Sequence, residues 1–154
     1  MNVNKAQKEI FNAMLSSERC HKYELDEKSV FITIGGYYGY VIPYSQIQIN
    51  LAKIPDCQNL DIESVVRKEN LCELTKEAVI LEHPRRYVRK LKRGNERIYF
   101  NEKFMSCFQN PKFYNAHPHR IIVVTEDISA TRNNEIVGVI LPMNIADQVK
   151  ESED

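Results

Sequence analysis

The feature that most constrains the fold of this chain is a repeat of two in its apolar residues. Residues 30–34 are mainly β-branched, and polar and apolar residues alternate strictly over 46–51. The same strand character returns over 72–81, 120–125 and 135–141. A period of two is typical of a β-strand, because successive side chains point to opposite faces of a sheet. Strands that follow one another through short turns are expected to pair antiparallel.

Two stretches have instead the spacing of an amphipathic helix. The first is predicted over residues 5–19, with Asn4 as N-cap and Gln7 completing a capping box. Its expected buried face consists of Ile10, Phe11, Met14 and Leu15. The second is predicted to follow the cap residue Asn101, with Phe104, Met105 and Phe108 on one face. A shorter helix after Asp61 would bury Ile62, Val65 and Val66.

Helices and strands do not alternate along the chain as they do in parallel sheets. We therefore predict an α+β fold with a mostly antiparallel sheet backed by two helices. The 154 residues suit one domain over 1–145, followed by a polar acidic tail over 146–154. The residues expected to be buried are Phe11, Leu15, Ile32, Ile47, Ile49, Phe104, Phe108, Ile122, Val124, Val139 and Leu141.

We expect a cytoplasmic protein without a membrane partner. No apolar run approaches the roughly 18 residues that span a bilayer, and the first residues lack the apolar stretch of a signal peptide. Twenty-one basic residues balance 21 acidic ones, which excludes a globally basic nucleic-acid binder but not a local patch.

Motifs for catalysis, metals and cofactors are missing from the sequence. It has no phosphate-binding glycine loop, nucleophile elbow or zinc-protease motif. Cys20, Cys57, Cys72 and Cys107 lack metal-ligand spacing and are expected to be reduced. Of these, Cys72 and Cys107 lie in apolar patterns and should pack as small hydrophobic residues. We expect no catalytic residue, no metal and no cofactor.

Two alternatives to this expectation remain open. His117 and His119, two residues apart, would point to one side of an extended chain and could begin a metal site. The adjacent carboxylates of Glu126 and Asp127 could bind a divalent cation. A hydrolase would use Glu126, Asp127 and His119; solvated loops explain the same residues without chemistry.

Positive charge is concentrated in one segment. Residues 82–97 have a net charge of +5, and they overlap a hairpin predicted over residues 85–100 that turns at Gly94 and Asn95. Such a patch suits contacts with phosphates, and Tyr87 and Tyr99 beside it could stack on bases. The alternative is an exposed hairpin kept soluble by its charges. The candidate nucleic-acid-binding residues are Arg85, Arg86, Arg89, Lys90, Lys92 and Arg93.

A second cluster consists of tyrosines around three glycines. Tyr37, Tyr38, Tyr40 and Tyr44 surround Gly35, Gly36 and Gly39. No basic residue lies between Lys28 and Lys53, so nucleic-acid stacking would lack phosphate contacts here. We expect these tyrosines to form sheet core and a protein interface.

Two motifs resemble one known family. Residues 98–105, Ile-Tyr-Phe-Asn-Glu-Lys-Phe-Met, resemble the strand-to-helix entry in the last domain of bacterial DNA polymerase processivity clamps, the sliding clamps. Residues 137–145 are similar to that domain's final strand, which ends in Met-Pro-Met or a variant. The resemblance covers about a third of the chain. It implies a clamp-type domain and a peptide-capturing pocket at Val139, Leu141, Pro142 and Met143.

The chain also departs from that family. It has one domain where a bacterial clamp chain has three, and Asn144 stands where an arginine usually follows the closing motif. A ring around DNA would need six such domains, which implies a homo-oligomer.

We therefore expect a non-enzymatic binding protein of clamp-like fold that associates with duplex DNA, with replication or repair proteins, or with both. The alternative is a small protein-interaction or inhibitor module, of the kind that mobile elements carry, without DNA contact. A local basic stripe with tyrosines favours the first; overall neutrality and the acidic tail favour the second.

Overall fold

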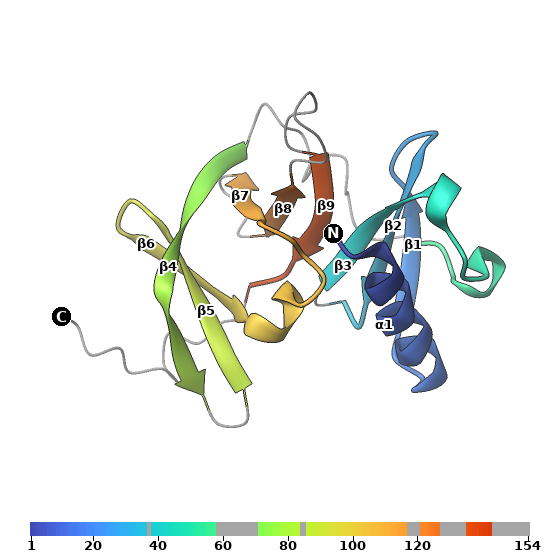
Figure 1. Cartoon of the computed structure of the whole chain (residues 1–154), viewed down its shortest axis with the longest axis horizontal. Helices are drawn as coiled ribbons and strands as arrows, with labels where there is room; N and C mark the ends of the chain where they lie inside the picture. The colour runs from blue at the N-terminus through green and yellow to red at the C-terminus, as the bar shows by residue number, and fades with distance from the viewer. Residues whose placement is uncertain (37, 58–70, 84–85, 117–120, 127–134, 143–154) are drawn as a thin grey trace.

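The computed structural model describes residues 1–36, 38–57, 71–83, 86–116, 121–126 and 135–142, and for 78–83, 86 and 116 the backbone alone. The described residues form one α-helix and nine strands, whose arrangement is drawn in Figure 1. The elements are α1 (Val3–Leu15), β1 (Cys20–Glu24), β2 (Ser29–Ile34), β3 (Tyr38–Pro43), β4 (Leu71–His83), β5 (Arg86–Arg93), β6 (Glu96–Asn101), β7 (Lys112–Ala116), β8 (Ile122–Glu126) and β9 (Glu135–Ile140). The described residues also contain the 3-10 turns η1 (Tyr44–Gln46), η2 (Leu51–Lys53) and η4 (Glu102–Met105).

All nine strands belong to one sheet in the order β1-β2-β3-β9-β8-β7-β4-β5-β6. Each neighbouring pair is antiparallel. The predicted α+β class with a mostly antiparallel sheet is thus confirmed. The last strand, β9, lies between β3 and β8, so the end of the described chain joins two parts of the sheet that are distant in sequence. The sequence patterns had not indicated β7.

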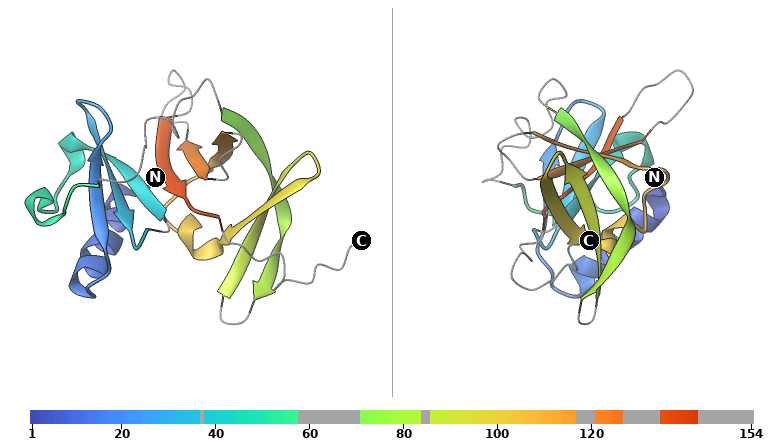
Figure 2. Two further views of the ribbon diagram at one scale, coloured as in Figure 1. Left: turned by 180° about the vertical axis from the view of Figure 1, so that it is seen from behind. Right: turned by 90° about the vertical axis from the view of Figure 1, so that its left-hand side faces the viewer.

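The long strand β4 bends the sheet. Its first residues pair with β7 from Leu71 to Leu74, whereas Thr75 and the residues after it pair with β5. The register shifts between Lys76 and Ile80, and such irregularities bend and twist a strand. Figures 1 and 2 show the result: β4–β6 form one lobe, β1–β3 with α1 form the other, and β7–β9 lie between them.

The helix α1 packs on β1 and β2 through small residues. Ala6, Ile10 and Ala13 are buried, whereas Phe11 is 50% exposed and Leu15 is 69% exposed. The predicted burial of Phe11 and Leu15 is therefore wrong. Residues 6, 10 and 13 form a stripe of their own, and two alanines on that stripe let the helix lie close to the sheet. The apolar spacing alone did not distinguish the two stripes.

The start of α1 also differs from the prediction. The N-cap is Asn2, whose side chain accepts a hydrogen bond from the backbone N–H of Lys5. The predicted partner in a capping box, Gln7, is buried instead. Its amide donates to the Gln46 carbonyl at 2.9 Å and accepts from the Gln48 N–H at 2.7 Å. The Gln7 side chain thus supplies backbone hydrogen bonds that a neighbouring strand would otherwise supply to residues 46 and 48.

That contact explains why residues 46–51 do not form the predicted strand. The segment lies between η1 and η2, with Ile47 and Ile49 half-buried against the core rather than fully buried. A strand needs a partner for its backbone groups, and here a glutamine side chain supplies two of those hydrogen bonds.

The predicted second helix is a single 3-10 turn, η4. Asn101 caps it as expected, by accepting from the Lys103 N–H, and Phe104 and Phe108 are buried as predicted. The helix does not continue because other groups take its carbonyls. The Asn2 N–H donates to Cys107 O at 2.8 Å, and Lys5 Nζ donates to Ser106 O at 3.1 Å. In the described residues α1 is therefore the one α-helix.

The main core lies on the sheet face that α1 and η4 cover. Phe104 stacks on Tyr38 with ring centroids 4.1 Å apart, and Phe100 packs against Phe113 at 5.5 Å. Tyr40 is fully buried, in line with the expected role of the tyrosines in the sheet core. Ile32, Ile122, Val124 and Val139 are also buried as predicted, whereas Leu141 is 44% exposed, so its predicted burial is wrong.

A smaller apolar cluster, here called the outer cluster, lies on the opposite face. It consists of Phe31, Val41 and Val139, with Tyr23, Leu25, Ile121 and Ile136 packed against it. Two glycines make room for rings on the two faces. A Cβ on Gly39 would lie 2.8 Å from the Phe31 ring, and one on Gly138 would lie 2.6 Å from the Phe108 ring.

Several predicted features lie outside the described residues: the short helix over 62–66, Tyr37 and the acidic tail over 146–154.

Candidate functional site

The predicted basic hairpin is present as β5 and β6. The two strands pair from Val88 opposite Asn101 to Arg93 opposite Glu96. They turn at Gly94, whose φ of +58° is a left-handed conformation that glycine adopts without strain. Because side chains alternate along a strand, the hairpin divides its basic residues between two faces. We call the face that carries Leu91 and Ile98 the inner face and the opposite one the outer face.

Arg89 is held on the inner face. It is 8% exposed, and its guanidinium donates to both carboxylate oxygens of Glu102, at 2.7 and 2.6 Å. A third hydrogen bond of 3.2 Å reaches the Glu77 carbonyl. The hydrogen bonds to Glu102 raise the pKa of Arg89. The expectation that Arg89 is exposed is wrong, because it anchors the hairpin to η4.

Arg93 is also engaged inside the molecule. Its Nη1 donates to Asn115 Oδ1 at 3.1 Å, and Asn115 on β7 is buried. This contact ties the turn end of the hairpin to the middle of the sheet. Arg89 and Arg93 therefore both have structural partners, which the sequence pattern of seven positive charges did not reveal.

The outer face carries the remaining cations. Lys92 is exposed and lies directly opposite Arg97, while Lys90 lies opposite Tyr99. Thr75 of β4 is the neighbour of Lys92 on the other side. Lys90, Arg97 and Tyr99 also make contacts within the chain. Tyr87 is 60% exposed and lies two residues before Arg89, so it belongs to the inner face. Tyr99 belongs to the outer face, and the two tyrosines of the hairpin therefore do not share a face.

Two of the six predicted residues are not placed. Arg85 lies outside the described residues, and Arg86 is described by its backbone alone, in β5 opposite His83. Arg97 also lies on the outer face, but it is not one of the six predicted residues. Its alternation with Tyr99 and its place in the hairpin are the sequence signals that could have indicated it as a binding residue.

The residues of the predicted peptide pocket differ in how far they are exposed. Val139 lies inside the outer cluster and is 6% exposed, whereas Leu141, two residues later, is 44% exposed. Pro142 is half-buried, and Met143 lies outside the described residues. Of this motif, Leu141 and Pro142 are the described residues with surface that a partner can reach.

The carboxylate considered for metal binding has other partners. Glu126 is buried, with one oxygen contacting the Met1 ammonium group and the other accepting from the Gln109 N–H at 2.7 Å. Both oxygens are thus engaged within the protein. Asp127, His117 and His119 lie outside the described residues. The described part of the chain contains no group of three His, Cys, Asp or Glu side chains that could hold a metal.

A partly buried polar network lies beneath α1 and includes a thiol. Tyr40 donates to one oxygen of Glu9 at 2.5 Å, and Ser106 donates to the other at 3.0 Å. Burial raises the pKa of the Cys107 thiol beside them. Burial, followed by the hydrogen bonds that the hydroxyl makes with Cys107 and Glu9, raises the pKa of Tyr40. A thiol that keeps its proton is a poor nucleophile, so this network joins α1, β3 and η4 rather than forming a catalytic site.

All four cysteines are unpaired. Cys20 is buried, and burial followed by the charge of Glu18 raises the pKa of its thiol. Cys72 is exposed, so its predicted packing as a small hydrophobic residue is wrong. Strand alternation places it on the same face of β4 as the buried Leu74, but nearer the start of the strand.

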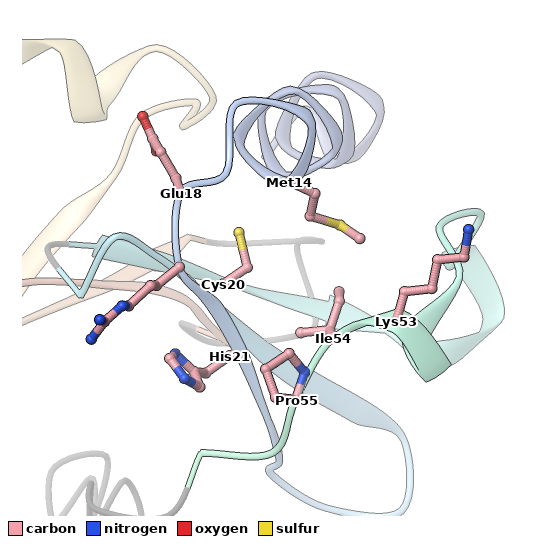
Figure 3. Close-up of a pocket in the computed structure, with 8 residues that line it drawn as sticks. Met14, Glu18, Cys20, His21, Lys53, Ile54 and Pro55 are labelled. Atoms are coloured by element: carbon pink, nitrogen blue, oxygen red, sulfur yellow. The ribbon is translucent and has the colours of Figure 1, made fainter.

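Cys20 also lines a cavity of about 370 Å³ between α1 and the loop before Cys57. Figure 3 shows that Cys20 points toward Met14 of α1, whereas His21 lies on the other side of β1. The two side chains therefore form no thiol–imidazole pair. Charged groups of Glu18 and Lys53 stand at the edges of this cavity.

Comparison of the chain with protein-family models, with curated proteins and with solved structures finds no match. No helix in the described residues is long and apolar enough to cross a membrane.

Proposed function

We propose that this protein is a non-enzymatic binding protein whose β5–β6 hairpin contacts the phosphate backbone of DNA through its outer face. The observation that carries this proposal is the placement of Lys90, Lys92 and Arg97 on one side of a two-stranded ribbon. Lys92 and Arg97 are direct cross-strand partners. Their side chains therefore start from adjacent positions on one face, from which both can approach one phosphate group.

The division of the hairpin supports a separation of roles. Arg89 and Arg93 hold the hairpin to η4 and β7, which keeps the outer face in a fixed orientation. The outer cations then supply the attraction to phosphates through release of bound counterions. Tyr99, beside Lys90, adds a ring on which an unpaired base can stack.

The resemblance to sliding clamps extends the proposal. Residues 98–105, at the β6–η4 junction, and 137–145, which begin in β9, carry that resemblance. It favours duplex DNA as the nucleic acid and a clamp-like domain that assembles with further copies and with replication or repair proteins. Leu141 and Pro142 would contact such protein partners.

A second candidate is a protein-interaction or inhibitor module without DNA contact. The observation that favours it is a set of exposed large apolar side chains, Phe11, Leu15, Tyr87 and Leu141, in a chain with no net charge. Exposed apolar residues of this size are typical of protein interfaces when they gather.

The test is the salt dependence of binding to a labelled DNA duplex, measured by fluorescence anisotropy. We expect Lys92→Glu and Arg97→Glu each to lower the log–log salt slope by roughly 0.9 and to weaken binding to all sequences alike. The control is Lys28→Glu, an equal charge change at an exposed site far from the hairpin in sequence, which should leave the slope unchanged. Undetectable binding of the unaltered protein at about 0.15 M salt would favour the second candidate.

A further inference from the structure

A second cavity, of about 420 Å³, lies where the segment after α1, the turn between β2 and β3, and η4 meet. We call it the Tyr38 cavity. Its volume falls in the range of about 300–1,000 Å³ that is usual for small-molecule sites. It shares Glu18 and Arg19 with the cavity drawn in Figure 3. Tyr38 lines it from the sheet, and Lys103 and Phe104 line it from η4.

One wall of the Tyr38 cavity is aromatic. The rings of Tyr38 and Phe104 are stacked, with an interplanar angle of 22°, and Phe104 is buried whereas Tyr38 is half-buried. Tyr38 thus offers ring surface to a ligand, and a second flat ring packs well against such a surface. Burial, followed by the charges of Glu9 and Glu18, raises the pKa of the Tyr38 hydroxyl, so it keeps its proton and remains a hydrogen-bond donor.

Three charged side chains line the same cavity. Glu18, Arg19 and Lys103 are exposed, and none of the three forms an ion pair with another described residue. The Lys103 ammonium group lies 5.6 Å from the centre of the Phe104 ring, a cation–π contact that keeps it beside the aromatic wall. One carboxylate and two cations are therefore available to a ligand beside an aromatic surface.

Backbone hydrogen bonds fix the two charged residues that follow α1. The chain leaves the helix through Ser17, whose φ of +60° is a left-handed conformation. The Glu18 N–H then donates to Ala13 O at 2.9 Å, and Arg19 O accepts from the Gly35 N–H at 2.7 Å. Glu18 is thus tied to the helix and Arg19 to the β2–β3 turn. A site that is fixed before binding loses less entropy when a ligand arrives.

We infer that the Tyr38 cavity binds a free α-amino acid with an aromatic side chain. The ring of the ligand would pack against Tyr38, and its ammonium group would face Glu18. Its carboxylate would face Arg19 and Lys103, and a guanidinium can bind a carboxylate through two parallel hydrogen bonds. This inference does not depend on the DNA proposal, because the outer face of the hairpin does not line the cavity.

The experiment titrates the isotope-labelled full chain with L-phenylalanine and follows the backbone amide signals of the protein by NMR. We expect saturable shifts at Arg19, Gly35 and Lys103. Three other ligands each lack one recognised group: L-alanine lacks the ring, hydrocinnamate lacks the ammonium group and phenethylamine lacks the carboxylate. Each should bind roughly fivefold more weakly than L-phenylalanine, because it loses one contact.

Two variants assign the charges of the ligand to residues. Glu18→Gln should weaken the binding of L-phenylalanine roughly fivefold but should not weaken that of hydrocinnamate, which has no ammonium group to lose a partner. Arg19→Gln should weaken the binding of L-phenylalanine by a similar factor but should not weaken that of phenethylamine, which has no carboxylate. Equal weakening of every ligand by either variant would contradict this assignment.

The matched control is Glu27→Gln, the same change as in Glu18→Gln at an exposed residue that does not line the cavity. It should bind all four ligands as the unaltered protein does, and thermal unfolding should show that all variants are folded. The absence of saturable shifts, equal binding of the four ligands, or shifts confined to other parts of the chain would overturn the inference.

Discussion

The two ends of the nine-stranded sheet are held in different ways. At the β1–β3 end, α1 packs through alanines and an isoleucine, and its buried polar group, Gln7, bonds only to backbone. At the β4–β6 end, charged side chains hold the hairpin: Arg89 to Glu102 and Arg93 to Asn115. At the first end close apolar packing is supplemented by the hydrogen bonds of Gln7 and Glu9, whereas the hairpin at the second end is held by the partners of two arginines. A cluster of like charges in sequence can therefore be partly structural.

The largest expected loss of stability comes from the apolar contact of Phe104 with Tyr38, between the two ends of the sheet. Phe104→Ala should lower the free energy of unfolding by about 3–5 kcal/mol, because it removes a buried ring and leaves a cavity. Phe104 is 6% exposed and stacks on Tyr38 of β3. Urea denaturation measures the change.

The matched control is Phe11→Ala, the same substitution at a ring that is 50% exposed. It should cost less than about 1 kcal/mol. Equal losses at the two positions would mean that α1 buries the stripe predicted from sequence and not the one observed.

The next effect concerns the polar attachment of the hairpin. Arg89→Met should lower stability by about 2–3 kcal/mol, because Glu102 keeps a partly buried charge without its partner. Changing Glu102→Leu as well should recover most of the loss, which a double-mutant cycle measures.

The variant Arg89→Met also tests which face of the hairpin contacts DNA. Arg89→Met should leave the salt slope of DNA binding unchanged, whereas Lys92→Met should lower the slope and change stability by less than about 0.5 kcal/mol. A reduced slope in Arg89→Met would place phosphate contacts on the inner face and contradict the division drawn here.

A smaller effect concerns alkaline pH and the buried thiols near α1. The pKa values of Cys20 and Cys107 are raised above the ordinary 9.0, so the folded protein keeps protons that the unfolded chain loses. Stability should be full below pH 9 and fall as the pH rises above it. Urea denaturation across this range checks the fall.

Two substitutions assign that pH dependence. Cys20→Ala should reduce the fall above pH 9, whereas Cys72→Ala, at an exposed thiol, should leave it unchanged. A stability that rises with pH over this interval would be inconsistent with protonated buried thiols.

Local pattern predicted the elements whose partners are close in sequence. The hairpin was predicted with its turn at Gly94 and Asn95, and the β2, β8 and β9 strands agree with their β-branched runs. The strand predicted over 46–51 does not form, although the residues alternate as in a strand. Its backbone hydrogen-bond partner is the side chain of Gln7, about 40 residues away. The second helix failed similarly, because groups of Asn2 and Lys5 take carbonyls at 106 and 107.

The candidate sites depended even more on distant contacts. The net charge of +5 over 82–97 was evident from composition, but nothing in that segment indicated that Glu102 and Asn115 would take two of its arginines. The Tyr38 cavity had no sequence signal, because its charged and aromatic residues come from three segments that are distant in the sequence.

The sequence by itself determined the strand-rich α+β class, the antiparallel hairpins and the basic segment, since each follows from neighbouring residues and short turns. Only the tertiary structure decided which helix stripe is buried, which arginines are structural and which charged residues meet beside Tyr38. The physical reason is that strand and helix periodicity are local properties of the backbone. Burial and polar pairing depend on which residues, distant in sequence, the fold brings into contact.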